Sequence, residues 1–237
     1  MIIYPFSVAV LNAIFATVVW RQFVSRKRPH QLVWTVALLL GCLAAVFYLL
    51  FLAFGHNDVL FKLYYIGGAL LMAAYLGLGS VYLHAPRTIA NWMTGALVVA
   101  SLIGIVSLMA AGIDPIRLDA AAATVGPGTN AIASGPWKAM VALLNSFGAL
   151  AVIGGAVYSA WVTAKRRAPA NFLYANVLIA IGTFVAALAG GFADQGTFAG
   201  AFWVVLALGF AILFGGFLLT MPDIFRSKRL LSLGGEN

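Results

Sequence analysis

The chain has 237 residues, of which 63% are hydrophobic and only 8% are charged, and its formal net charge is +8. Soluble domains carry about 25% charged residues, so this composition excludes a water-soluble fold and indicates that lipid surrounds much of the chain. The basic residues form short clusters between apolar runs rather than a stripe interleaved with aromatic residues, which argues against nucleic acid as a partner.

Seven apolar runs reach the roughly 20 residues that a helix needs to cross the hydrocarbon core of a bilayer. In chain order they cover residues 2–20, 32–54, 59–83, 88–112, 139–164, 171–193 and 198–221. We therefore expect an all-α membrane protein, a seven-transmembrane-helix bundle that forms a single domain over residues 1–237. Four spans fall in residues 1–112 and three in residues 138–221, with a loop at residues 113–137 and a tail at residues 222–237.

The lysines and arginines predict the orientation of the bundle. Eleven of the 14 fall on one side of the predicted spans, and only Lys62, Arg117 and Lys138 fall on the other. Because these residues concentrate in cytoplasmic loops, we expect the N-terminus outside and the C-terminus in the cytoplasm, in a multi-pass protein of the plasma (inner) membrane. Nine of them are expected to anchor the topology and to contact lipid: Arg26, Lys27, Arg28, Lys165, Arg166, Arg167, Arg226, Lys228 and Arg229.

The connection at residues 113–137 is the only long one, and it is rich in alanine, glycine, serine and threonine. Asp114 followed by Pro115 predicts the start of a short helix that lies at the membrane surface and ends near residue 123. The connection is either a surface crossover between two groups of spans or a lid over an outward-facing cavity, since long loops are often functional.

Spans one to three share a pattern with spans five to seven, because a basic cluster followed by a proline occurs at residues 26–29 and again at residues 165–169. This predicts a parallel repeat with the fourth span as a linker, a plan that some transporters use. The three-plus-one-plus-three plan is similar to that of the SWEET and PQ-loop facilitators, which implies transport of a small solute. Their Pro-Gln pair does not occur here, and Pro29 and Pro169 stand at the starts of spans two and six instead, so the resemblance covers architecture alone.

Four polar residues inside the predicted spans are candidates for lining a ligand cavity: Asn12, Tyr75, Asn145 and Asn176. Tyr75 is expected to share one helical face with Tyr64 and Tyr82, at separations of 11 and 7 residues. A polar group at this depth must find a partner away from water. These residues therefore either form hydrogen bonds between helices or surround a bound ligand.

Two histidines, His30 and His84, are expected at the same cytoplasmic depth on neighbouring spans. Two imidazoles so placed could be the axial ligands of a haem iron. Both stand close to prolines at the predicted lipid boundary, where polar residues are common, and nothing in the sequence requires a cofactor. Haem or pigment binding is therefore kept as an alternative.

Small residues recur at every fourth position within several predicted spans. Examples are Ala73 with Gly77, Ala151 with Gly155, and the run Gly182, Ala186, Gly190. Such spacing lets two helix backbones approach closely, so it predicts a tightly packed bundle.

Function is constrained mainly by what the spans lack. No Asp or Glu falls inside a predicted span, which argues against an ion-coupled pump or transporter, and no hydrolase motif occurs. We expect a non-catalytic binding or accessory protein, sensory or part of a complex, with membrane lipid and other membrane-protein subunits as partners. The alternatives are a SWEET-like facilitator or carrier of a small uncharged or lipophilic solute, and a haem or pigment protein.

Overall fold

The computed structural model describes residues 2–55, 57–167, 169–191, 193 and 200–221. These residues form helices and no strand, and an isolated antiparallel bridge joins Ile113 to Ile132. Seven helical segments among them are long and apolar enough to cross a membrane. The prediction of an all-helical bundle with seven helices of spanning length is therefore confirmed.

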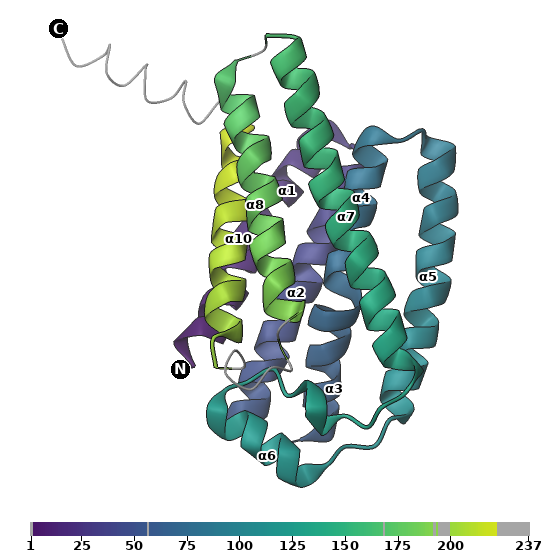
Figure 1. The fold of residues 1–237 in the computed structure, drawn as a ribbon, viewed down its shortest axis with the longest axis vertical. Coiled ribbons are helices and arrows are strands. Elements are labelled where there is room, and N and C mark those ends of the chain that lie inside the picture. Colours follow the sequence, from purple (N-terminus) through teal and green to yellow (C-terminus); the bar gives the residue numbers. More distant parts are fainter. Residues whose placement is uncertain (1, 56, 168, 192, 194–199, 222–237) are drawn as a thin grey trace, which may run out of the picture.

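The spans are, in chain order, α1 (Ile3–Arg26), α2 (Pro29–Ala53), a third span in three parts, α5 (Arg87–Ala110), α7 (Pro136–Lys165), α8 (Ala170–Gly191) and α10 (Phe202–Leu219). The third span consists of α3 (Asp58–Tyr64), the π-helix η1 (Tyr65–Met72) and α4 (Ala73–His84). Between α5 and α7 lie α6 (Pro115–Thr124) and the 3-10 turn η2 (Thr129–Ala131) (Figure 1). The short helix predicted after Asp114 is thus present.

Local residue choices explain where several helices begin. Pro29 and Pro136 occupy the first turn of α2 and of α7, where a backbone N–H would have no partner within the helix anyway. The side chains of Asn57 and Asp114 accept hydrogen bonds from the first free N–H groups of α3 and α6.

Helix α1 is longer than the first predicted span, which was expected to close at Arg21. It continues to Arg26 because arginine is a good helix former whose long side chain can carry its charge toward water or lipid headgroups. It ends where Lys27 takes a left-handed conformation with φ 52°, two residues before Pro29.

Six of the spans form a closed ring, and the fourth span lies outside it. Around the ring α1 packs on α2, α2 on the third span, the third span on α7, α7 on α8, α8 on α10, and α10 back on α1. Helix α5 packs on the outside, against α7 and α4 (Figure 1). The predicted parallel repeat stays a prediction.

The two ends of the bundle differ in charge. We name the end that carries α6 and η2 the loop end, and the end with the α1–α2, α4–α5 and α7–α8 connections the basic end. The described anchors lie at the basic end: Arg26, Lys27, Arg28, Lys165, Arg166 and Arg167. The tail at residues 222–237, with Arg226, Lys228 and Arg229, lies outside the described residues.

Glycines bring two pairs of helices into backbone contact. A Cβ on Gly148 of α7 would run into the carbonyl group of Ala73, and one on Gly77 would lie 2.7 Å from the Cα of Gly148. Across the ring, a Cβ on Gly209 of α10 would lie 2.7 Å from the backbone nitrogen of Ala186 in α8. The close packing predicted from small residues is confirmed at these two crossings.

The π-helix η1 rotates the two halves of the third span relative to each other. Because a π-helix closes i→i+5 hydrogen bonds in a wider turn, side chains before and after it lose the shared face expected from the α-helical period. Tyr64 faces the inside of the ring, whereas the Tyr82 hydroxyl is hydrogen-bonded to Asn91 and Thr94 of α5. Tyr75 does not line the cavity and packs against a hydrophobic cluster that includes Leu97 of α5. The prediction of one continuous tyrosine face is wrong for this reason.

Candidate binding cavity

The ring of six spans encloses a cavity of about 620 Å³, lined mainly by apolar side chains. The lining residues come from all six spans of the ring, from the segment between α5 and α7, and from Ala193 after α8, and none of the described ones comes from α5. Sites for small molecules usually measure about 300–1,000 Å³ and are mostly apolar with a few polar groups. The cavity is therefore the candidate functional site of this protein.

Aromatic side chains form the wall of the cavity toward the loop end. Tyr64, Tyr65, Trp137 and Trp203 line it, and neighbouring rings among them have centroids 5.3–5.7 Å apart. Behind this wall, Tyr48 packs on Trp203 with a centroid distance of 4.7 Å. Tilted and edge-to-face pairs at these distances are mutually attractive, so the wall is well supported.

The hydroxyl group of Tyr64 is a polar group at the cavity that forms no hydrogen bond with the described residues. Tyr64 is only 4% exposed and lines the cavity, and its hydroxyl has no hydrogen-bond partner among the described residues. From the sequence, Tyr64 was expected only to lie near a membrane interface, and its position in the cavity lining was not predicted. The glycine pair Gly67-Gly68, which follows Tyr64 in the sequence, could have indicated a close helix contact at this site. Gly67 lets η1 approach α2 closely, because a Cβ on Gly67 would lie 2.9 Å from the carbonyl oxygen of Leu40.

Asn145 connects α7 to the π-helix. Its Nδ2 donates a hydrogen bond of 2.8 Å to the carbonyl oxygen of Ala69, and both residues line the cavity. Its Oδ1 has no hydrogen-bond partner within the described part of the chain. π-Helical segments occur frequently at functional sites, and here the segment is held by a side chain that keeps one acceptor for a ligand.

Two of the four residues predicted to line a cavity do so, namely Asn145 and Asn176, and the structure brings them to the same space from adjacent helices. Asn176 donates to the carbonyl oxygen of Phe172 in its own helix at 2.7 Å. Asn12 and Tyr75 do not line the cavity. Asn12 is buried in α1, and Tyr75 packs against a hydrophobic cluster that includes Leu97 of α5.

The border of the cavity nearest the basic end contains Ser80, His84 and Ser159. The Nδ1 of His84 lies 2.9 Å from the carbonyl oxygen of Ser80, and its Nε2 lies 2.8 Å from the hydroxyl oxygen of Ser159. His30 packs edge-on against Trp34 with a centroid distance of 5.2 Å. Because both ring nitrogens of His84 already contact protein groups, haem ligation would require one of these contacts to break, and the geometry does not favour that alternative.

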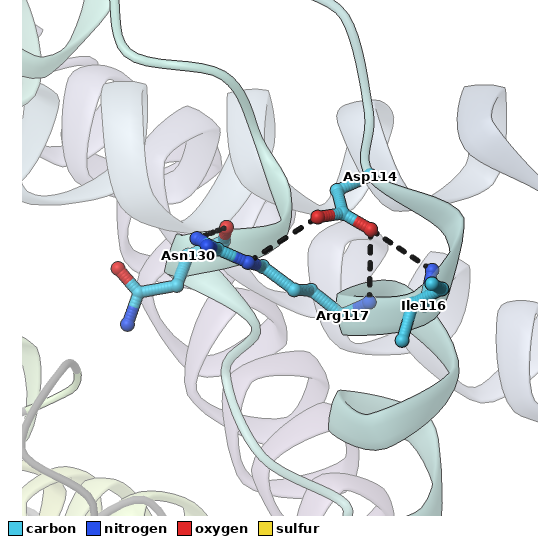
Figure 2. A network of polar contacts seen from close by, with 4 residues as sticks. All are labelled: Asp114, Ile116, Arg117 and Asn130. Carbon is cyan, nitrogen blue, oxygen red and sulfur yellow. Dashed lines mark hydrogen bonds and ion pairs between the residues drawn. The ribbon is translucent and has the colours of Figure 1, made fainter.

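Residues 112–135, which we name the cap segment, fold over the loop end of the ring. Asp114 accepts hydrogen bonds from the backbone N–H groups of Ile116 and Arg117, and its second oxygen lies 3.3 Å from Arg117 Nε (Figure 2). Arg117 also donates to the carbonyl oxygen of Asn130 at 3.3 Å. This network ties α6 to η2, so the cap segment folds as one unit.

The cap segment is hydrogen-bonded to the spans beneath it. The Tyr48 hydroxyl donates to the carbonyl oxygen of Gly126 at 2.7 Å, and the Tyr65 hydroxyl donates to the hydroxyl oxygen of Thr129. Pro127 and Thr129 are themselves part of the cavity lining. The long connection thus covers the cavity at the loop end, which is the position expected from its interpretation as a lid.

Comparison with protein-family models, with curated proteins and with solved structures found no match to this chain. Among the described residues, no group of three or more His, Cys, Asp or Glu side chains could hold a metal ion. The cavity is therefore the feature of the molecule from which a function can be inferred.

Proposed function

We propose that this protein is a non-catalytic membrane protein that binds a largely apolar or small uncharged ligand inside the ring of six spans. The observation that carries the proposal is the cavity of about 620 Å³, with its apolar lining and its cover at the loop end. A bundle whose only role was to fill space in a complex would have no need of such a cavity.

The lining defines the chemistry of the ligand. A charged group at mid-membrane depth is costly without a partner, and the middle of the cavity offers it asparagine, serine, threonine and tyrosine rather than a charged side chain. Lipid chains are as apolar as the cavity wall, so burial of apolar surface alone gives a ligand little preference over the bilayer. We expect polar groups that line the cavity to supply that preference.

A carrier or facilitator is the second candidate, and one observation favours it. Exposed residues line the cavity near both of its ends, with Leu83 and His84 at the basic end and Ala142 nearer the loop end. A cavity that can be reached from two sides suits passage as well as binding. Export of a preloaded labelled ligand from proteoliposomes separates the two candidates, since a binding protein without transport activity gives no export above protein-free vesicles.

The binding proposal is tested by narrowing the cavity. Ala149 lines it on α7, whereas Ala211 is an exposed residue of α10 that does not line it. We expect Ala149→Phe to weaken binding of an uncharged apolar dye, Nile red, by roughly tenfold, because a phenyl ring then takes space that the dye would fill. Binding is measured by dye fluorescence on protein in nanodiscs.

Ala211→Phe is the matched control, because it adds the same side chain on the outer face and should leave dye binding unchanged. Thermal unfolding of both variants reports whether they fold as well as the unaltered protein. Equal dye binding by both variants, or absence of saturable binding to the unaltered protein, would contradict the proposed function.

A further inference from the structure

The cavity opens sideways between α7 and α8, in their halves nearest the loop end. Ala142 and Ser146 of α7 line the cavity and are exposed, and so are Ala187 and Gly190 of α8. Figure 1 shows the two helices meeting at their connection at the basic end and diverging toward the loop end. A Cβ on Gly190 would meet no atom within 4 Å. Because hydrocarbon surrounds the spans, such an opening admits molecules that are dissolved in the bilayer.

Lys138 stands where this opening reaches the loop end. It lines the cavity, and it lies one turn before Ala142 and two turns before Ser146, on the same face of α7. Its Nζ lies 5.6 Å from the centre of the Trp137 ring. The third residue of a spanning helix is at headgroup depth, so this ammonium group meets the polar edge of the membrane while its neighbours meet the cavity.

The charge of Lys138 is not balanced by an ion pair with Asp114, the acid that borders the same hollow. Lys138 borders a smaller hollow of the cap segment together with Asp114 and Arg117. Asp114 is already paired with Arg117 at 3.3 Å, and no carboxylate within the described residues forms an ion pair with Lys138. Within the part of the chain that the structure describes, Lys138 therefore brings to this opening a positive charge without an ion-pair partner, above an apolar space.

We propose that the ligand is a single-chain amphiphile with an anionic headgroup, a long-chain carboxylate, whose chain enters between α7 and α8 while its carboxylate stays at Lys138. This inference rests on the proposed function and specifies its ligand. A carboxylate is too costly to bury in the apolar cavity, so it stays at the interface and pairs with the ammonium group there. The chain extends past Ala142 and Ser146 into the middle of the cavity.

The test uses tryptophans that the cavity already contains. Trp34, Trp137 and Trp203 line it, so a chain that carries bromine at its middle should quench their fluorescence when it is bound. The probes are stearate brominated in mid-chain and the corresponding brominated alcohol, added to protein in zwitterionic nanodiscs. We expect saturable quenching by both, with tighter binding of the carboxylate.

The headgroup contact is tested with Lys138→Gln, which should weaken carboxylate binding by about tenfold and leave alcohol binding unchanged, while Lys138→Arg keeps the preference. Lys165→Gln is the matched control: the Nζ of Lys165 lies 5.2 Å from the Trp161 ring on the same helix, and that lysine does not line the cavity. Equal loss for both probes in Lys138→Gln would show a structural role and overturn the inference.

The entry path is tested with Ala142→Phe, which should slow the onset of quenching by the carboxylate several-fold, with Ala211→Phe as the control. An unchanged onset would overturn lateral entry. Equal affinity for carboxylate and alcohol would overturn the headgroup assignment and leave the proposed function intact. Absence of saturable quenching by either probe, on protein that still binds Nile red, would overturn the inference and leave the proposed function intact. Absence of binding of all three molecules would remove the proposed function itself.

Discussion

At the scale of single residues, the asparagines at membrane depth differ in what they bond. Asn12 donates to the carbonyl oxygen of Val8 in its own helix at 2.9 Å, and its buried Oδ1 has no hydrogen-bond partner. Asn176 likewise bonds within its own helix, whereas Asn145 reaches across to the backbone of η1. The hydrogen bonding between helices that the sequence suggested for all of them therefore holds for Asn145 alone.

This difference predicts opposite effects of the same substitution. Asn145→Leu should lower the free energy of unfolding by about 1 kcal/mol, because it removes a hydrogen bond between helices in the membrane. Asn12→Leu should leave stability unchanged or raise it, because it removes a buried acceptor that no donor satisfies. Thermal unfolding in mild detergent measures both, and equal destabilisation by the two changes would contradict the assignment.

At the scale of elements, the crossing of α4 and α7 depends on the absence of side chains at the contact. Gly148 is buried there against the backbone of Ala73, whereas Gly154 of the same helix is exposed and has nothing within 4 Å of the position of a Cβ. We expect Gly148→Ala to destabilise the protein by roughly 1–3 kcal/mol, as overpacking does.

Gly154→Ala is the control for this prediction, since both changes add one methyl group to α7. It should be neutral or stabilising by about 0.5–1 kcal/mol, because alanine favours a helix more than glycine does. Denaturation in detergent, followed by helical circular dichroism, compares the two variants. A similar loss of stability in both would mean that the α4–α7 contact is looser than the structure shows.

The spans could be predicted from the sequence because the thickness of a bilayer fixes their length and apolar character. The short helix after Asp114 was predictable as well, since Asp114 caps it locally. The cavity wall was not. The π-helix changes the rotation between Tyr64 and Tyr75, and its hydrogen-bond pattern arises where η1 packs against α2 and meets Asn145, residues far apart along the chain.

At the scale of the whole molecule, the ring explains why one span differs from the rest. Each of the six ring helices has one face toward the cavity and two neighbours within the ring, whereas α5 packs on the outside of α7 and the third span. It supports the cavity wall from behind, since the Ser107 hydroxyl oxygen of α5 accepts a hydrogen bond of 2.9 Å from the backbone N–H of Trp137. The cap segment joins α5 to α7 and covers the loop end of the ring, so α5 fixes the position at which the cap segment begins.

The distribution of charge predicts how this ring sits in the membrane. The sequence predicts that eleven of the 14 lysines and arginines lie on one side of the spans, and the basic end should therefore face the cytoplasm. Ile116 of the cap segment is 80% exposed, and Ser25 is exposed at the opposite end of the bundle. We expect a membrane-impermeant thiol reagent to label Ile116→Cys in intact cells. Ser25→Cys should be labelled only after the membrane is permeabilised. Cys42, the single native cysteine, lies within α2 at membrane depth and gives the background for both. Labelling of Ser25→Cys but not Ile116→Cys in intact cells would reverse the orientation and place Lys138, with the opening beside it, on the cytoplasmic leaflet.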